Sequence, residues 1–332
     1  MVSDLQILVA RTAKMPPSVT PSTLLLRQTD NFLELLSGVR DGDTAAIHDA
    51  RVATRRMREL LPLVAEGLSP ADAEQLDRIL RESTQRLGRA RDVDAKLEML
   101  TGIEPGLPLS SGEVGRLRLE WQEERDRRVR RAIKSLERMD VEAACRELHR
   151  TLLQDRPSFM GLRRHASAAP RWEDTLLARL RERAGDVVEG VGRAGGVLFP
   201  KRLHGARVSV KKLRYAMEIA TATGRIDFEG DLRQIRKAQE LLGRIHDHDV
   251  LADGIRAARL GAQRLLPLIE LERRRLHTRY LRRRAALLDI SGRVAVSASR
   301  DHRALSIRRS VLAASVPLVM LALPLVRRAR SA

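Results

Sequence analysis

Two segments of this chain carry the same spacing of histidine and basic residues. In IHDARVATRRMREL (47–60) and LHGARVSVKKLRYA (203–216), a histidine is followed by basic residues three, seven, eight and ten positions later. The residues are His48, Arg51, Arg55, Arg56 and Arg58 in the first segment and His204, Arg207, Lys211, Lys212 and Arg214 in the second. Steps of three, four and three return to one side of a helix. We therefore predict two basic stripes: stripe one is His48, Arg51, Arg55 and Arg58, and stripe two is His204, Arg207, Lys211 and Arg214.

Such stripes are suited to binding a multiply charged anion. Like charges along one helix edge repel one another, so a stripe without a partner is unfavourable. Arginine forks match phosphate oxygens and form charge-assisted hydrogen bonds. Further basic residues at helical spacing follow each stripe: Arg78, Arg81 and Arg89, then Arg233, Arg236, Lys237 and Arg244. This set exceeds what one phosphate needs, so it predicts a polyanion such as polyphosphate. The alternative is a solvated face in which the arginines pair with nearby carboxylates.

The histidine of each stripe has two interpretations. His48 and His204 either donate to the anion, gaining a proton when phosphate binds, or pack locally and stay neutral. A motif following each stripe helix, L-G-R-x-x-D-x-D, contributes two aspartates per copy: Asp92 and Asp94, then Asp247 and Asp249. Acids beside a polyanion would repel it, so we predict that they cap helices or orient arginines.

A catalytic alternative comes from HDHD at 246–249, which could form a metal site of the phosphohydrolase kind. The aligned positions in the first copy are Arg91 and Val93, so these histidines lie outside the repeated pattern. No Ser–His or Cys–His arrangement indicates nucleophilic chemistry. We therefore predict a non-enzymatic protein with no catalytic residue, metal or cofactor.

Composition narrows the class of protein. The 332 residues are 43% hydrophobic and 32% charged, which is typical of a globular chain. Aromatic residues make up only 2%, so the core must be aliphatic and single-stranded nucleic acid would find few stacking platforms. The net charge of +19 leaves double-stranded nucleic acid open as an alternative ligand. The single cysteine and the N-terminus, which lacks the features of a signal peptide, indicate the cytoplasm.

Apolar residues recur at steps of three and four along most of the chain, which predicts an all-α fold. Expected helices include 22–37, one from 44, 72–89, one from 92, 114–139, 141–153, 173–191 and 264–288. LDRILRESTQRLGRARDVDA aligns with DLRQIRKAQELLGRIHDHDV, as the two stripes align with each other. We therefore predict an internal duplication, with two pseudo-two-fold-related halves of four or five helices each.

The two H-x-x-R-V-x-x-[RK]-[RK]-x-R segments, each followed by L-G-R-x-x-D-x-D, resemble the CHAD family, the conserved histidine α-helical domain, over 22–288. The resemblance implies two helical bundles flanking a central basic cavity. It also implies binding of inorganic polyphosphate and association with polyphosphate granules. Some members of the family are fused to a triphosphatase-type CYTH domain, which is not expected beside this one, so a catalytic partner would come from another chain.

The expected organisation is an N-terminal extension at 1–21, a CHAD-like domain at 22–288 and a C-terminal tail at 289–332. The domain divides into 22–154, a linker at 155–172, and 173–288. An apolar run at 311–326 is flanked by arginines and contains Pro317 and Pro324, which are expected to break a helix. We expect an irregular or strand-like end, or alternatively an anchor to a membrane or granule surface.

Overall fold

The computed structural model describes residues 19–103, 111–154, 171–196, 199–258 and 262–328, and this part of the chain is all-α, as predicted. The first half contains α2 (Pro21–Arg40), α3 (Thr44–Leu60), α4 (Pro70–Ile103), α5 (Ser111–Arg138) and α6 (Val141–Gln154). The second contains α7 (Trp172–Arg193), α8 (Pro200–Ala222), α9 (Glu229–Ala257) and α10 (Leu266–Arg328). Short 3₁₀ turns are η1 (Leu61–Leu63), η2 (Ala65–Gly67) and η4 (Ala262–Leu265). The predicted 1–21 extension and 155–172 linker fall almost wholly outside the described residues.

The stripe helix of the first half begins where the sequence predicts. Asp43 precedes α3 and its Oδ1 accepts a hydrogen bond of 2.6 Å from the Ala46 amide, which satisfies one of the free amides of the first turn. The preceding Gly42 has φ +73°, which an L side chain rarely adopts, so the turn from α2 to α3 depends on this glycine. Together these two residues fix the point at which stripe one starts.

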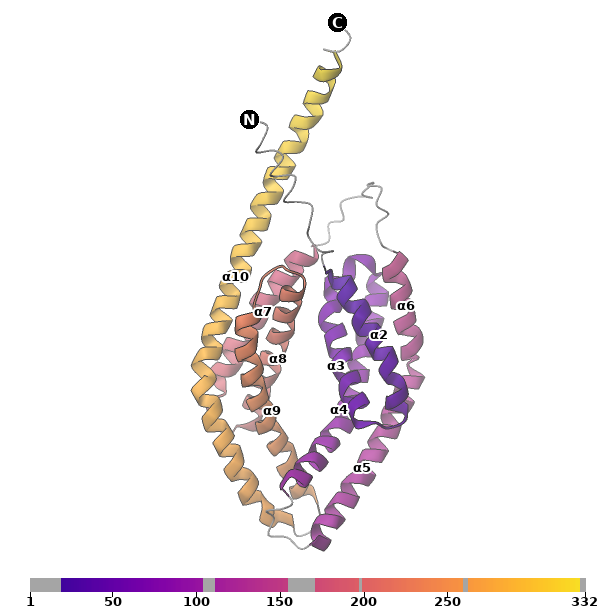
Figure 1. Cartoon of the computed structure of the whole chain (residues 1–332), viewed down its shortest axis with the longest axis vertical. Coiled ribbons are helices and arrows are strands. Elements are labelled where there is room, and N and C mark those ends of the chain that lie inside the picture. Colours follow the sequence, from indigo (N-terminus) through magenta and orange to yellow (C-terminus); the bar gives the residue numbers. More distant parts are fainter. Residues whose placement is uncertain (1–18, 104–110, 155–170, 197–198, 259–261, 329–332) are drawn as a thin grey trace.

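The two halves lie side by side and converge at one end (Figure 1). There, apolar residues of α4, α5, α9, η4 and α10 form one buried cluster, including Leu100, Trp121 and Ile255. The helices approach closely at Gly254 of α9, because a Cβ atom there would lie 2.9 Å from Lys96 Cδ and 3.2 Å from Trp121 Cζ2. A larger aliphatic core, with Phe32 and Tyr280 among its few aromatic residues, fills the interior of the rest of the two halves.

A second join between the halves is polar. Arg179 of α7 donates to Glu59 of α3 at 2.6 Å, and both side chains are mostly buried. α7 also packs against η1, which directly follows α3. The stripe helix α3 is therefore held in place by contacts from both halves.

Two helix boundaries differ from the prediction. The expected break between 89 and 92 does not occur, because α4 is one helix of 34 residues, and α9 runs equally through its own copy of the motif. α10 also continues past 288, burying Ile290, Val294 and Ala298, and it extends to Arg328. The expected irregular or strand-like end was wrong, since proline can be accommodated within a helix.

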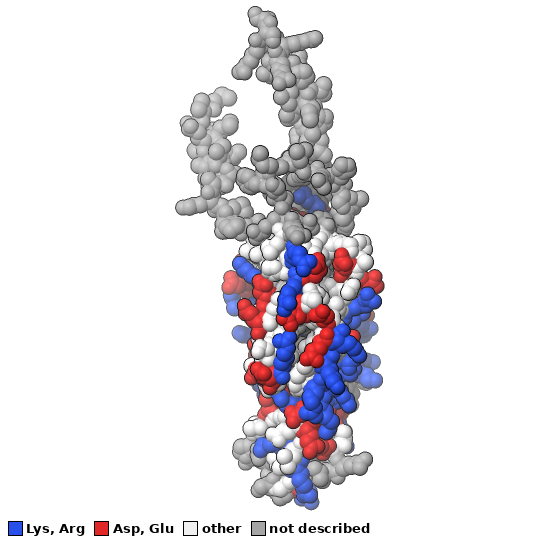
Figure 2. Space-filling view, turned by 90° about the vertical axis from the view of Figure 1, so that its right-hand side faces the viewer, with Lys and Arg blue, Asp and Glu red and all other residues white. Residues whose placement is uncertain are grey.

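Charge is mixed on the outer surface. On the face at the right of Figure 1, basic and acidic side chains are interspersed over the described residues (Figure 2). Within the described residues, no helix carries an apolar stretch long enough to cross a bilayer. The side chains of 307–328, which include the apolar run, lie outside the description.

Candidate functional site

The two stripes face each other across the halves. α3 and α8 approach within 8 Å between Cα atoms. Charges on one stripe lower the pKa values on the other: Arg207 acts on Arg51 and Arg55, and both of these act on Lys211. We call these four residues, Arg51, Arg55, Arg207 and Lys211, the cationic cluster. The structure thus brings together the middle of both predicted stripes.

Arg51 is the most enclosed arginine of stripe one. Burial, followed by the charge of Arg55, lowers the pKa of its guanidinium to about 10. Its Nε is buried without a hydrogen-bond partner among the described residues. Gly88 of α4 leaves room for this side chain, because a Cβ atom there would lie 3.0 Å from Arg51 Nε. Arg51 therefore retains an N–H donor that no described residue uses.

Lys211 occupies the position in stripe two that Arg55 occupies in stripe one. Burial is the largest cause that lowers its pKa to about 6, and Arg207, Arg55, Arg51 and Arg214 follow. The amine is therefore mainly neutral at pH 7, although Lys211 belongs to a basic stripe. An anion among these arginines would reverse the local field and favour the ammonium form.

Nearby carboxylates compensate the cluster only in part. Asp92 and Asp247 favour the charged form of Arg207, yet burial still lowers the pKa of that guanidinium. Burial also raises the pKa of Asp247 itself, in spite of the neighbouring Arg207. The net field between α3 and α8 is therefore positive.

Each stripe histidine contacts a side chain of a neighbouring helix. The two contacted residues, Arg91 and His246, occupy equivalent positions in the two copies of the repeat. Arg91 Nε donates to His48 Nδ1 at 3.3 Å, and His246 Nδ1 lies 3.5 Å from His204 Nδ1. Burial and basic neighbours lower the pKa of both stripe histidines, and burial followed by Arg207 lowers that of His246 to about 3. His246 and Arg91, which the alignment of the two copies places at equivalent positions, thus make equivalent contacts although their residue types differ. These surroundings favour the neutral form of all three imidazoles in the protein alone.

The ends of both stripes are neutralised by carboxylates of their own halves. Arg58 pairs with Asp77 at 3.1 Å, and Arg214 pairs with Glu218 at 2.9 Å. Three other predicted residues are also paired: Arg81 with Asp77, Arg236 with Glu218, and Arg244 with Glu272. For these five arginines the structure matches the alternative of a salt-bridged face.

The remaining predicted basic residues are not part of the cationic cluster. Arg78, Arg89, Arg233 and Lys237 are exposed, and Lys212 is half-buried. Arg56 lines a cavity of about 190 Å³ between α2, α3 and α8, together with Tyr215 and Glu218. Tyr215 is buried and acts to raise the pKa values of Arg51 and Arg55, a role that the spacing of the stripe residues does not suggest.

The four residues of HDHD point to different partners. His246 contacts His204, and Asp247 acts on Arg207. The buried His248 instead bonds through Nδ1 to the Arg244 carbonyl at 2.7 Å, and Asp249 pairs with Arg273 of α10 at 3.3 Å. Within the described residues, no group of three or more His, Cys, Asp or Glu side chains is arranged to hold a metal ion.

Two aspartates of the repeated motif orient arginines, as predicted, although none of the motif's aspartates caps a helix. Asp94 accepts from Arg125 Nε at 2.6 Å, and the same guanidinium donates to the Gly42 carbonyl and to Thr44 Oγ1. Asp249 pairs with Arg273 in the second half. These pairs fasten α5 to α4 and α10 to α9, and the first also secures the start of α3.

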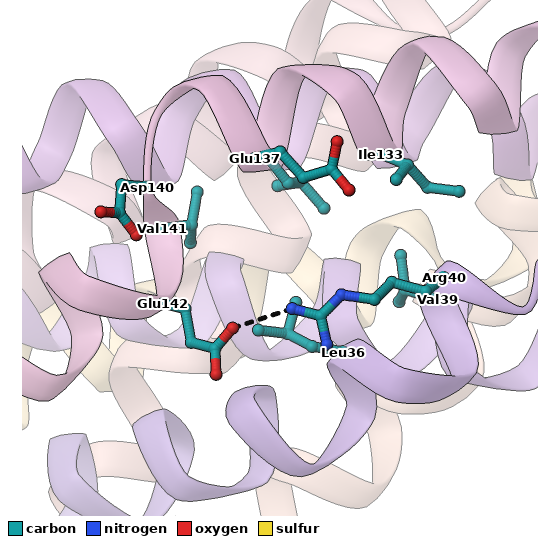
Figure 3. A pocket seen from close by; sticks show the side chains of 9 residues that line it. Leu36, Val39, Arg40, Ile133, Glu137, Asp140, Val141 and Glu142 are labelled. Atoms are coloured by element: carbon teal, nitrogen blue, oxygen red, sulfur yellow. Dashed lines mark hydrogen bonds and ion pairs between the residues drawn. The ribbon is translucent and has the colours of Figure 1, made fainter.

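A separate cavity of about 240 Å³ lies in the first half, between α2, α5 and α6 (Figure 3). Leu36, Val39 and Ile133 supply apolar walls, and Arg40 reaches across to Glu142 at 2.8 Å. Glu137 and Asp140 add further negative charge. This lining does not suit a polyanion, so the cavity is not part of the basic site.

Comparisons with known proteins agree with this architecture. The crystal structure of the CHAD domain from the plant Ricinus communis is 17% identical, with 86% of this chain and 93% of that chain covered and a TM-score of 0.48. PptA from Streptomyces chartreusis is 18% identical, with 86% of this chain and 100% of that chain covered and a TM-score of 0.54, which shows the shared fold. No curated protein matches the chain. The CHAD domain family model matches residues 23–256, more than half of the sequence, and the chain therefore belongs to the CHAD domain family.

Proposed function

We propose that this protein binds inorganic polyphosphate between α3 and α8, without catalysis of its own. The observation that supports this most is the cationic cluster, in which burial lowers the pKa values of all four cations. Charges of the opposite stripe lower those of Arg51, Arg55 and Lys211 further, and Asp92 and Asp247 compensate only in part. A bound polyanion would supply the missing negative charge to both halves at once. Charge-assisted hydrogen bonds to phosphate oxygens would also satisfy Arg51 Nε.

The composition of the chain favours polyphosphate over single-stranded nucleic acid. Stacking of single-stranded bases needs aromatic side chains, and these are only 2% of the sequence. Polyphosphate has no bases and needs only a succession of cationic donors.

The proposal of binding without turnover rests on the chemistry of the donor set. The cluster residues are arginines and a lysine, which hold phosphate, and within the described residues no group of three or more His, Cys, Asp or Glu side chains is arranged to hold a metal ion for hydrolysis. His246 is the one residue of the HDHD segment that contacts a stripe histidine. We further propose, from the expected properties of the family, that binding associates the protein with polyphosphate granules in the cytoplasm.

Competition between polyanions tests the binding proposal. Labelled polyphosphate is displaced with unlabelled polyphosphate, duplex DNA or RNA at matched phosphate concentration, in buffers of several salt concentrations. Polyphosphate is expected to compete best at every salt concentration. Stronger competition by DNA or RNA would contradict the proposal and favour nucleic-acid binding.

Turnover is tested separately. The protein is incubated with polyphosphate or nucleotides and with Mg²⁺, Mn²⁺ or Zn²⁺, and released phosphate is measured against the His246→Ala variant. No release above background is expected from either protein. Release that His246→Ala abolishes would establish a phosphohydrolase instead.

A further inference from the structure

The outward side of α10 carries a second basic surface, separate from the cationic cluster. Residues that follow one another at steps of three and four lie on one side of a helix. We call the residues at these steps from 268 to 303 the outer stripe: Leu268, Leu271, Arg275, Arg279, Arg282, Ala286, Asp289, Arg293, Val296, Arg300 and Arg303. All eleven residues are exposed. The outer stripe therefore presents six arginines and a single acid to the surroundings.

The packing of α10 fixes the direction in which the outer stripe points. The opposite side of the helix, which includes Leu276, Tyr280, Leu287 and Val294, is buried, and α10 packs against α7 and α9. α10 runs along the outside of the second half and continues beyond the ends of α7 and α8 (Figure 1). The outer stripe therefore points away from the helices that hold α10 in place.

Most of the positive charge on the outer stripe is not neutralised by ion pairs. Arg275 pairs with Glu272 at 3.6 Å, and Arg293 pairs with Asp231 at 2.6 Å. The other four arginines form no ion pair with a described residue: Arg279, Arg282, Arg300 and Arg303. A partner with many negative charges is therefore attracted to this side of α10.

Apolar side chains on the same stripe indicate the kind of partner. Leu268, Leu271 and Val296 are between 47% and 49% exposed. Nucleic acid and polyphosphate bind through their phosphates, which do not bury leucine or valine. A second copy of the stripe would repel the first, because six arginines would face six. An anionic lipid surface matches both kinds of side chain, since apolar groups enter the acyl boundary while arginine stems let their guanidinium groups reach lipid phosphates.

We propose that the outer stripe of α10 docks on the surface of a bilayer that contains anionic phospholipids. The helix lies along the surface, with Leu268, Leu271 and Val296 at the acyl boundary and the arginines on lipid phosphates. α10 continues into the apolar run at 311–326, which is flanked by arginines, so further apolar sequence lies on the same helix beyond the stripe. Docking would hold the basic site between α3 and α8 at the membrane, and this consequence rests on the proposed function.

Binding of the full chain to lipid vesicles tests the proposal. Sedimentation is measured with vesicles of phosphatidylcholine alone and with vesicles of equal parts of phosphatidylcholine and phosphatidylglycerol. The anionic vesicles are expected to bind the protein at least about tenfold more tightly. Equal binding to the two kinds of vesicle, or no binding to either, would overturn the proposal.

Two triple variants with the same change in charge show which surface binds the vesicles. The first reverses charge on the outer stripe: Arg279→Glu, Arg282→Glu and Arg300→Glu. The second reverses charge at exposed positions of α5: Arg130→Glu, Arg131→Glu and Lys134→Glu. The α10 variant should lose at least about tenfold in affinity for anionic vesicles, and the α5 variant should lose much less. Equal losses would mean attraction by net charge and would contradict docking through α10. Circular dichroism checks that each variant is folded.

A fluorescent label reports whether the outer stripe enters the lipid. Val296→Cys on α10 and Leu119→Cys on α5 each introduce a cysteine at an exposed apolar position. The native Cys145 is buried, so it is protected from labelling in the folded protein. An environment-sensitive dye at position 296 should emit at shorter wavelength when anionic vesicles are added, whereas a dye at 119 should not change. An unchanged spectrum at 296, or equal shifts at both positions, would refute insertion of the stripe.

Polyphosphate and duplex DNA distinguish this surface from a site for phosphate polymers. The α10 variant retains the cationic cluster, so its affinity for polyphosphate should be unchanged. Loss of polyphosphate or DNA binding with vesicle binding intact would assign the outer stripe to a phosphate polymer and overturn the proposal. If the unmodified protein binds anionic vesicles through α10 but does not bind polyphosphate, only the proposed function fails.

Discussion

Gly88 of α4 allows the Arg51 guanidinium to lie directly against the helix: a Cβ atom at this position would be 3.0 Å from Arg51 Nε. The equivalent glycine of the second half, Gly243, has no atom within 4 Å of such a Cβ. The same motif position therefore shapes the basic site in the first half only. This difference gives a matched pair of substitutions.

Gly88→Ala is expected to weaken polyphosphate binding without unfolding the protein. The added methyl group displaces the flexible Arg51 side chain, whereas alanine within a helix stabilises it by about 1 kcal/mol relative to glycine. Gly243→Ala should bring a similar gain in stability with unchanged affinity. Thermal unfolding and polyphosphate titration of both variants check this. Equal loss of affinity in the two variants would show that Arg51 placement is unimportant.

Alanine substitutions should separate the cationic cluster from the paired arginines. Arg51→Ala, Arg55→Ala, Arg207→Ala and Lys211→Ala are each expected to cost about 1.5–3 kcal/mol of binding free energy, because each removes a charged donor. Arg58→Ala should cost less, since Asp77 already neutralises Arg58. Arg127→Ala, an exposed change on α5, serves as the control. Binding at fixed ionic strength is measured, with helical content as the check on folding. Similar losses at all six positions would indicate general charge attraction.

Lys211→Met is expected to stabilise the protein while weakening binding. The folded-state pKa of Lys211, about 6, is below its unfolded value, so the unfolded chain binds more protons between these values. The cost to folding is therefore full below about pH 6 and fades as pH rises toward the ordinary lysine value. The gain in unfolding temperature from Lys211→Met should be larger at pH 7 than at pH 9.5. A gain that does not change with pH would reflect packing rather than charge.

Polyphosphate affinity should rise as pH falls. The pKa values of His48 and His204 are lowered in the protein alone by burial and basic neighbours, and a polyanion would raise them. Binding then takes up protons, so affinity increases as pH falls through the window between the lower free and higher bound pKa values. The double variant His48→Gln, His204→Gln should show a flatter pH dependence between about pH 5 and 8. The affinity of both proteins is titrated against pH at fixed ionic strength. An identical pH slope would assign both histidines a structural role only.

The sequence alone predicts the stripe helices well, because the spacing of His48, Arg51 and Arg55 fits only one side of a helix. It does not predict that α4 continues through L-G-R-x-x-D-x-D, since glycine and aspartate disfavour helix interiors. Tertiary contacts override that preference: Gly88 accommodates Arg51, and Asp94 binds Arg125 of α5. Spacing along the chain contains no information about either contact.

The unneutralised part of the site is also a tertiary property. Arg58 and Arg51 have the same residue type on the same stripe, yet Arg58 forms an ion pair with Asp77 of α4, whereas the buried Nε of Arg51 has no hydrogen-bond partner among the described residues. His246 and Arg91 differ in type, yet each contacts the stripe histidine of its own half. Alignment of the two copies identifies equivalent positions, and only the packed helices show which charges remain unpaired.

The apolar cluster at the converging end constrains the order in which the protein folds. Leu100 and Trp121 pack there with Ile255 and Ile269, which are far along the chain. The ribosome therefore releases the first half well before these partners exist, and apolar side chains of α4 and α5 stay exposed meanwhile. Contacts between residues so distant in sequence form slowly, because a long loop must close first. This end should be the last part of the protein to fold and the part that most needs chaperones during synthesis.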